Sequence, residues 1–198
     1  MMKIEDFYKL YAESDGVSID SRTILPNQIF FAIKGENFDG HDYVSQLVKE
    51  GRHLAVIDDP KYKVNDQTIL IENTLEYLQD LARYHRQQFD IPVLAITGSN
   101  GKTTTKELLA ACLSNKFNLP ATRGNYNNHL GVPLTLLEAR ADVDFMIIEM
   151  GANHIGEIRE LCKIALPTHG LITNIGKAHI EGFGSVEGII KGKTELYD

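Results

Sequence analysis

The chain has 198 residues, of which 43% are hydrophobic and 24% charged, a composition typical of one large or two small globular domains. A formal net charge of −7 argues against a nucleic-acid partner, because binding a polyanion requires clustered Lys and Arg. No apolar run approaches the ~18 residues of a membrane-spanning helix, and the N-terminus lacks a signal-peptide core, so we expect no membrane insertion and a cytoplasmic location.

The first block, residues 1–88, is predicted to be a small α/β domain. Gly51 is expected to close its second helix and Asn73 to cap its third. A linker is expected at 90–92, because a residue before proline is pushed out of the helical region. Apolar periodicity places helices at 4–12, 43–50 and 73–88, and strands at 17–20, 29–33, 54–57 and 68–71.

The second block, residues 93–198, alternates strands and helices, which predicts a mostly parallel, three-layer α/β domain. Cys112 and Cys162 fall in predicted helices, and we expect buried free thiols in a reducing compartment. The last helix has no cap, Gly or Pro at its end, so we expect a chain cut inside a larger protein. Strands are expected at 93–97, 144–149 and 170–173, and helices at 102–114, 132–138, 156–164 and 186–197.

A glycine-rich turn between the first strand and first helix of this block is the most informative stretch. Its residues are Gly98, Ser99, Asn100, Gly101, Lys102, Thr103 and Thr104. Glycines let backbone N–H groups approach phosphate oxygens, and the helix N-terminus adds partial positive charge. We expect Lys102 to reach the β- and γ-phosphates of ATP and the Thr103 hydroxyl to bind Mg²⁺. The usual motif has Gly where this chain has Ile96, so an ordinary glycine-rich turn is the alternative.

Polar residues follow all three predicted strands, where ligands collect in parallel sheets. Glu149, at the end of the second strand, is placed to hold Mg²⁺ directly or through water, although it could instead cap a helix or a turn. His179, after the third strand, could bind a metal as neutral imidazole or serve a structural role. A loop with Asn125, Asn127 and Asn128 supplies amide groups, or is a solvated turn.

The last predicted helix carries a lysine, Lys193, on an otherwise apolar stripe. Loss of solvation on such a stripe favours the neutral amine, although lysines commonly extend to the surface instead. Lys191 lies off the stripe, near Glu187 and Glu195. The apolar members of the stripe are Val186, Ile189, Ile190, Leu196 and Tyr197.

Together these motifs resemble the Mur ligases, the ATP-dependent enzymes of peptidoglycan precursor assembly, which also use the short phosphate loop. The resemblance implies three domains, which bind the UDP part of the substrate, ATP, and the incoming amino acid or dipeptide. Residues 1–88 would be the first domain and residues 93–198 a truncated second, and the C-terminal dipeptide domain would be absent. The matching stretches are 20–22, 31–41, 97–105, 124–133, 149–154 and 174–185.

Within the family, the resemblance implies the activity that joins D-Ala-D-Ala to UDP-MurNAc-tripeptide through an acyl phosphate, using ATP and Mg²⁺, with this chain as an inactive fragment. Lys102, His179 and Lys193 would be catalytic. Thr103 and Glu149 would bind one Mg²⁺, and Glu149 and His179 would bind a second. Lys193 would be carbamylated and would contribute to the metal site as a carbamate. Ser21, Arg22, Asp39, Gly40 and His41 would form the UDP-binding edge, and Asn125, Asn127 and Asn128 the substrate-side loop.

Three alternatives remain open at this point. The ligase that adds the third residue of the same stem peptide has a similar first domain, but the Asn-rich loop and the stretch 149–154 favour the dipeptide-adding activity. Folylpolyglutamate synthase is a more remote relative without such a UDP-binding domain. A non-catalytic UDP-sugar or nucleotide-binding module is the alternative from another functional class.

Overall fold

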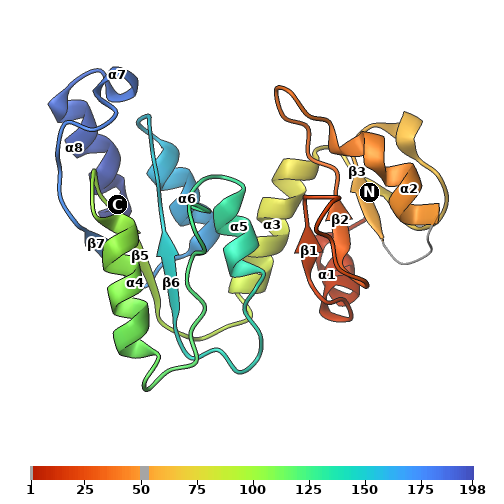
Figure 1. Cartoon of the computed structure of the whole chain (residues 1–198), viewed down its shortest axis with the longest axis horizontal. Helices are drawn as coiled ribbons and strands as arrows, with labels where there is room; N and C mark the ends of the chain where they lie inside the picture. The colour runs from red at the N-terminus through yellow and green to blue at the C-terminus, as the bar shows by residue number, and fades with distance from the viewer. Residues whose placement is uncertain (1, 50–53) are drawn as a thin grey trace. The chain divides into compact units, whose positions relative to one another are not determined.

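The computed structural model describes residues 2–49 and 54–198, which form a mixed α/β protein as predicted (Figure 1). The chain divides into two compact units, Met1–Tyr84 and His85–Asp198. Glu50 and Gly51, where the second helix was expected to end, lie outside the described residues. Among the described residues, no helix is both long and apolar enough to cross a membrane.

The first unit is built on a four-stranded parallel sheet in the order β1-β2-β3-β4. The strands β1 and β2 are shorter than predicted, because β1 pairs with β2, and β2 with β3, at only two positions each. The strands are β1 (Val17–Ser18), β2 (Ile29–Phe31), β3 (Ala55–Ile57) and β4 (Thr68–Leu70). The helices are α1 (Ile4–Ala12), α2 (Val44–Lys49) and α3 (Thr74–Arg86), with 3₁₀ turns η1 (Gly40–Tyr43) and η2 (Pro60–Tyr62).

Aromatic and aliphatic side chains pack on this sheet to form the core of the first unit. Phe7 of α1 meets Phe31 and Tyr77 edge-to-face, with ring centroids 5.9 Å and 5.2 Å apart. Burying one such phenylalanine contributes about 1.5–3 kcal/mol. A second cluster lies against α2 and comprises Phe30, Ala32, Val44, Leu47, Val48, Ala55 and Ile57.

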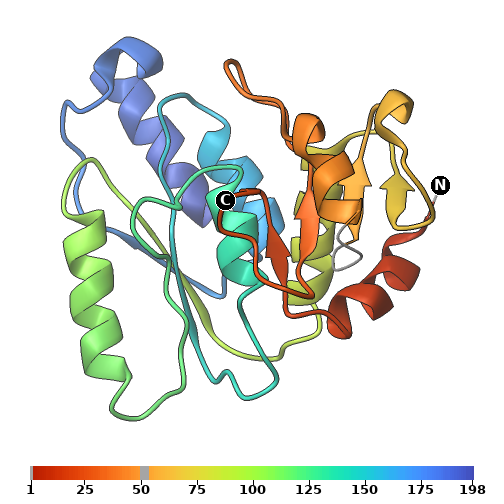
Figure 2. The same cartoon turned by 45° about the vertical axis from the view of Figure 1, so that its right-hand side comes forward.

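The second unit has a three-stranded parallel sheet with β5 (Val93–Thr97) between β6 (Met146–Glu149) and β7 (His169–Ile172). The chain crosses from β5 to β6 in one direction and from β6 to β7 in the other. Right-handed crossovers therefore place α4 (Lys102–Leu113) and α6 (Glu157–Ala165) on opposite faces, as Figures 1 and 2 show. The carboxyl ends of all three strands consequently share one edge, which gathers the loops that follow them.

The end of the chain contains one helix more than predicted. The short α7 (Ile180–Phe183) precedes α8 (Val186–Thr194), and the last turn is the 3₁₀ helix η3 (Glu195–Tyr197). Ser185 caps α8, since its Oγ accepts a hydrogen bond from the Gly188 N–H at 3.0 Å. Four residues are too few for helical periodicity to reveal α7 in the sequence. A further short helix, α5 (Gly131–Leu136), follows the Asn-rich loop.

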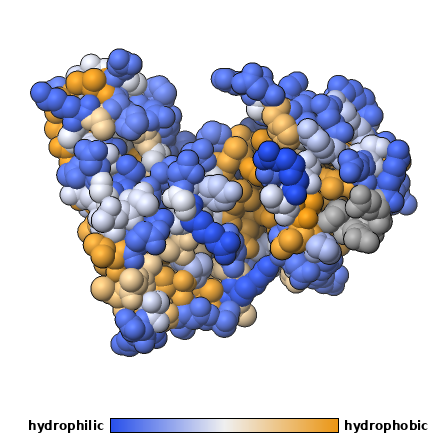
Figure 3. All heavy atoms as spheres, in the orientation of Figure 1, coloured by the Kyte–Doolittle hydropathy of each residue, from blue (hydrophilic) through white to orange (hydrophobic). Residues whose placement is uncertain are grey.

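The expectation of two buried thiols was wrong. Cys112 is exposed on α4 and Cys162 is partly exposed on α6. Burial nevertheless raises the pKa of the Cys162 thiol to about 11. Figure 3 shows apolar groups among hydrophilic ones on the viewed surface of the second unit. Consistent with that mixture, α4 carries Leu108 with 63% of its surface exposed.

Candidate functional site

The glycine-rich turn joins β5 to α4 at the shared edge of the sheet. Gly98 and Gly101 have φ values of +148° and +77°, in the region that favours glycine. The ammonium of Lys102 turns back over the turn and donates a hydrogen bond to the Gly98 carbonyl at 2.9 Å. The lysine predicted to meet a polyphosphate therefore lies across the loop that would hold it.

The turn is held from one side by the loop that follows β7. The side chain of Asn174 accepts a hydrogen bond from the Asn100 N–H at 3.1 Å and donates one to the Asn100 carbonyl at 3.0 Å. Thr173 Oγ1 also donates to that carbonyl, at 2.7 Å. Ser99 Oγ accepts from the Gly176 N–H at 2.9 Å. Residues after β7 therefore hold the glycine-rich turn through Ser99 and Asn100. The sequence analysis did not predict these contacts.

Glu149 brings together three of the predicted site residues. It ends β6 and is 1% exposed. Its Oε1 accepts hydrogen bonds from Thr103 Oγ1 at 3.3 Å and from Asn127 Nδ2 at 2.8 Å. Its backbone N–H donates to Thr122 Oγ1 at 2.8 Å. The first turn of α4, the end of β6 and the Asn-rich loop therefore converge on one carboxylate oxygen.

The donor set at this point suits a magnesium ion. A hydroxyl and a carboxylate oxygen, which are hard donors, lie 3.3 Å apart beside a phosphate-type loop. Mg²⁺ is commonly held by one or two such protein groups together with substrate phosphates. Among the described residues, no group of three or more His, Cys, Asp or Glu forms a closed metal cage. The Thr103 hydroxyl and the Glu149 carboxylate fit an ion whose remaining ligands are waters and the oxygens of a bound nucleotide.

Lys193 is buried, with 1% of its surface exposed, whereas Lys191 is exposed. Burial, together with the nearby charge of Lys102, lowers the pKa of Lys193 to about 8. Its Nζ lies 5.4 Å from the centre of the Phe183 ring. Phe183 belongs to α7, so the sequence analysis missed this neighbour together with the helix.

The apolar stripe expected around Lys193 was partly wrong. Val186, Ile190 and Tyr197 are 36%, 42% and 62% exposed, and only Ile189 and Leu196 are buried with the lysine. The change to a 3₁₀ turn after Thr194 alters the angle between successive side chains, so Tyr197 no longer follows the α-helical register.

Glu195, which was expected on the polar side of the last helix, is instead 3% exposed. Its two carboxylate oxygens accept hydrogen bonds from the backbone N–H groups of Gly156 at 2.7 Å and Arg159 at 3.2 Å. The first turn of a helix favours a negative charge, so Glu195 caps α6 from a distant part of the chain. The sequence gives no spacing signal for a cap of this kind.

His179 precedes α7 with a φ of +60° and is exposed. In the described part of the chain, no hydrogen bond or ion pair joins its ring to Glu149. The pairing of His179 and Glu149 at a second ion stays a prediction. The other two Asn residues of the loop differ in role: Asn128 Oδ1 accepts from the Leu130 and Gly131 N–H groups, and Asn125 is exposed.

In the first unit, the predicted UDP-binding residues form two turns. At the first, Arg22 donates two hydrogen bonds to the Asp20 carboxylate, at 2.9 Å and 2.7 Å. These bonds lower the pKa of Asp20 to about 2. Ser21 lies between the two residues and is half-buried. The guanidinium therefore has a fixed partner while remaining accessible to an anion.

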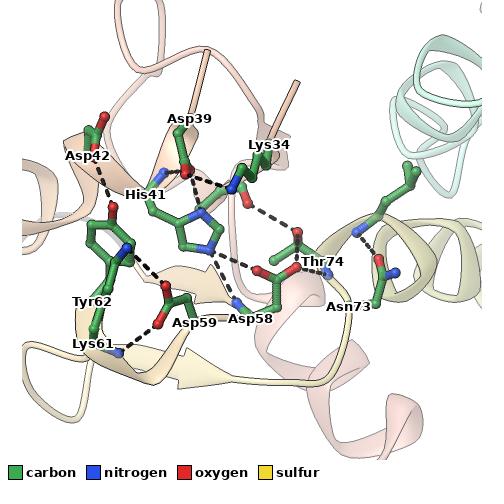
Figure 4. A network of polar contacts seen from close by, with 12 residues as sticks. Lys34, Asp39, His41, Asp42, Asp58, Asp59, Lys61, Tyr62, Asn73 and Thr74 are labelled. Carbon is green, nitrogen blue, oxygen red and sulfur yellow. Dashed lines mark hydrogen bonds and ion pairs between the residues drawn. The ribbon is translucent and has the colours of Figure 1, made fainter. Parts of the chain in front are cut away.

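The second turn is organised around His41, which is 2% exposed (Figure 4). Its Nδ1 lies 2.6 Å from Asp39 Oδ1 and its Nε2 lies 3.1 Å from Asp58 Oδ1. Asp58 Oδ2 in turn accepts hydrogen bonds from the N–H and Oγ1 of Thr74, both at 2.9 Å. Gly40 is buried beside this network, so Asp39 is the member of the predicted trio that keeps partial exposure.

Burial alone would raise the pKa of Asp39, but hydrogen bonds from the His41 side chain and backbone N–H lower it below the ordinary value. The ring of His41 also lies against Tyr62, with centroids 5.0 Å apart. Buried between two carboxylates, His41 fixes the loops after β2 and β3 relative to the start of α3. This network therefore fixes the conformation of the turn that is predicted to bind the UDP end of the substrate.

Comparison with known proteins places both units in one family. Residues 96–198 match the model of the Mur ligase middle domain, and residues 13–86 match a model described as Mur ligase family, catalytic domain. The first match covers more than half of the chain.

Named relatives agree with this match. The UDP-N-acetylmuramoyl-tripeptide–D-alanyl-D-alanine ligases of Synechocystis and Bacillus subtilis are 45% and 40% identical over 184 and 183 residues. These alignments cover 92% and 91% of this chain but 40% of each relative, so the chain spans about two-fifths of their length.

Solved structures are similar over the same region. MurF from Acinetobacter baumannii has a TM-score of 0.84 at 38% identity, covering 96% of this chain and 45% of that one. MurF ligase from Thermotoga maritima in complex with ADP also has a TM-score of 0.84, at 34% identity, covering 99% of this chain and 44% of that one.

Proposed function

The chain belongs to the Mur ligase family, and we propose that it supplies the UDP-binding unit and the first part of the ATP-binding unit of a dipeptide-adding ligase. The reaction would join D-Ala-D-Ala to UDP-MurNAc-tripeptide in the cytoplasm, with ATP consumed to activate the tripeptide carboxylate as an acyl phosphate. By this proposal residues 1–198 have no ligase activity alone, because they span only about two-fifths of the length of the named ligases they match.

The observation that carries the proposal is the convergence of Thr103, Asn127 and Glu149 beside the phosphate loop. A glycine-rich turn alone is a weak indicator of nucleotide binding. A buried carboxylate at the tip of the neighbouring strand, hydrogen-bonded to the first threonine of the helix, is an arrangement by which P-loop enzymes hold Mg²⁺ for phosphoryl transfer. The identity to named D-Ala-D-Ala ligases supports the choice of reaction.

Each of these residues would either neutralise the charge of the phosphate groups or hold a neighbouring group in position. Lys102 would exchange its contact with the Gly98 carbonyl for a phosphate oxygen and neutralise charge that develops during transfer. Thr103 and Glu149 would hold Mg²⁺, which supplies charge neutralisation when bound. Asn127 would keep the Glu149 carboxylate oriented towards Thr103.

Lys193 is proposed to act as a carbamate. Its amine is buried, and a neutral amine is the form that adds CO₂. The carbamate would replace a buried cation by an anion that pairs with a metal. His179 is proposed to reach the same region from the loop after β7 and to be a ligand of a second Mg²⁺.

The first unit is proposed to recognise the UDP end of the substrate. Arg22 is the exposed cation at the first turn, and Asp39 is the partly exposed acceptor at the second. Ser21, Gly40 and His41 would complete or support this edge. The loop with Asn125, Asn127 and Asn128 would face the muramyl-peptide part of the substrate.

A hybrid ligase tests the proposal. Residues 1–198 would replace the matching segment of the Bacillus subtilis relative, and ADP release would be measured with UDP-MurNAc-tripeptide and D-Ala-D-Ala. We expect release that requires both substrates. A hybrid that instead consumes UDP-MurNAc-dipeptide and a free third amino acid would assign the chain to the other stem-adding activity.

The same assay should be run on residues 1–198 alone. We expect no ADP release that depends on both substrates. Binding of ATP and of UDP to this chain would be measured by NMR shifts at the glycine-rich turn and at the Arg22 and Asp39 turns. If neither nucleotide causes such shifts, the assignment of both units is wrong.

A further inference from the structure

A second lysine is buried behind the candidate metal site. Lys106 lies on α4, one helical turn after Thr103, and is 0% exposed. Its Nζ donates a hydrogen bond to the Thr122 carbonyl at 2.5 Å and lies 2.9 Å from Glu107 Oε1. Glu107 is on the surface, with 67% of its side chain exposed. A completely buried ammonium is costly unless a charge compensates it.

The compensating charge inside the protein is Glu149. Lys106 Nζ lies 4.0 Å from Glu149 Oε2, an atom that is buried and has no hydrogen-bond partner within the described residues. The other oxygen, Oε1, accepts from Thr103 and Asn127. Oε1 of Glu149 therefore faces Thr103 at the start of α4, and Oε2 faces the ammonium of Lys106.

Thr122 connects the two charges. Its carbonyl accepts from Lys106, and its Oγ1 accepts from the Glu149 N–H at 2.8 Å. Thr122 is 1% exposed, and its own N–H is bonded to the Ile147 carbonyl at 3.0 Å on β6. Lys106 is therefore anchored to the same short segment that fixes the backbone of Glu149, and neither group can move far from the other.

We propose that Lys106 is the internal counterion and positioning residue of Glu149. It turns the carboxylate so that Oε1 faces Thr103. Its positive charge also opposes a divalent cation at Glu149, so the site takes up free metal poorly and binds it when nucleotide phosphates add negative charge. The second part rests on the proposed metal role of Glu149, whereas the first concerns the Lys106–Glu149 pair alone.

A double-mutant cycle tests the pair without metal. Lys106→Met, Glu149→Gln and the double variant would be made in this chain, and their thermal midpoints measured in EDTA. Lys106→Met should lower the midpoint by about 5 °C or more, because it leaves a buried carboxylate without its counterion. In the double variant the loss should be smaller than the sum of the two single losses. Additive losses would overturn the counterion role.

Folding failure does not block this test. If Lys106→Met does not fold, the double variant should fold, because neither buried charge remains. A double variant that is also unfolded would show that Lys106 serves packing alone. The matched control is Glu107→Gln, which removes the exposed carboxylate beside the same ammonium and should lower the midpoint by less than Lys106→Met does, because water solvates Glu107 whereas Glu149 is buried.

Metal affinity tests the second part, with Mn²⁺ alone as the probe and electron paramagnetic resonance as the readout. Removing the cation should tighten Mn²⁺ binding by roughly tenfold or more in Lys106→Met, and this gain should vanish in the double variant. Unchanged or weaker binding in Lys106→Met would overturn this part. If Mn²⁺ binds to none of the variants even with ATP, the proposed metal role of Glu149 fails, while the cycle in EDTA still decides the pair.

Discussion

The carboxylate of Glu195 accepts a hydrogen bond from the backbone N–H of Gly156 at 2.7 Å, although the two residues are 39 positions apart in the chain. This bond, with the one to the Arg159 N–H, joins the start of η3, directly after α8, to the beginning of α6. Lys193 is two residues before Glu195, so the cap also fixes the candidate carbamate position.

Glu195→Gln should therefore destabilise the second unit. Glutamine retains one acceptor but directs an NH₂ group at a backbone donor, and it removes the charge that favours the helix N-terminus. We expect a loss of about 1–3 kcal/mol in the free energy of unfolding, measured by urea denaturation. The control, Glu181→Gln at an exposed site, should change it by less than about 0.5 kcal/mol. Equal effects would mean that the cap contributes nothing measurable.

Gly98→Ala should disrupt the contact between the phosphate loop and the loop after β7. A Cβ at this position would lie 1.9 Å from Thr173 Oγ1, and the φ of +148° is unfavourable for alanine. We expect a loss of more than about 2 kcal/mol in the free energy of unfolding.

Gly101→Ala in the same loop is the matched control for Gly98→Ala. Its φ is +77°, but a Cβ there would meet nothing within 4 Å. Only the backbone cost, about 1 kcal/mol, should remain. A smaller loss for Gly98→Ala than for Gly101→Ala would contradict the close approach to Thr173.

The stability of the second unit should depend on pH through His85. Burial lowers the pKa of His85 from 6.5 to about 4, and its Nε2 lies 3.1 Å from the Ala139 carbonyl. Because the folded state keeps the ring neutral, the contribution of His85 is fully present above pH 6.5 and is lost as the pH falls towards 4. The loss should total about 3 kcal/mol.

Urea denaturation between pH 7.5 and 4 measures this effect as the difference between the unsubstituted chain and His85→Gln. Glutamine can still donate to the Ala139 carbonyl but does not titrate in this range. The variant should lose stability less steeply below pH 6.5. Parallel curves for the two proteins would refute the assignment to His85.

Lys193, rather than Lys191, should be essential for turnover in the hybrid ligase. Lys193 is buried beside Phe183, whereas Lys191 is exposed. Lys193→Ala should reduce turnover by about 10²–10³-fold, and added short carboxylates should restore part of it by standing in for the carbamate. Lys191→Ala should remain close to the unsubstituted rate. Rescue of Lys191→Ala instead would move the carbamate position by two residues.

The sequence was sufficient to predict the parts of the site that local patterns encode. The apolar run before Gly98 and the Lys-Thr pair after it predicted β5, α4 and the glycine-rich turn between them with nearly the observed bounds, whereas phosphate binding by this turn stays a prediction. Glu149 was assigned to a strand tip on the same grounds. The burial of Lys193 also followed from helical spacing.

Other parts depend on partners that are distant in sequence. Asn174 and Asn100 are hydrogen-bonded although they are 74 positions apart. Glu195 caps α6 through residues that are 39 and 36 positions away. Neither separation is a spacing that can be recognised in a sequence. Lys106 did offer a signal, because it follows Thr103 by one helical turn and so lies near the phosphate-loop side of α4. Its burial nevertheless depends on Thr122, whose segment has no regular periodicity.

The bonds between Asn100 and Asn174 have a mechanical consequence. The Asn174 side chain bonds to both the N–H and the carbonyl of Asn100, so a movement of the glycine-rich turn at Asn100 would strain its bonds to the loop that follows β7. Five residues further along that segment is His179, and beyond it come α7, which carries Phe183, and α8, which carries Lys193. The side chain of Asn174 thus ties the glycine-rich turn to the start of the segment that leads, through α7, to the buried Lys193.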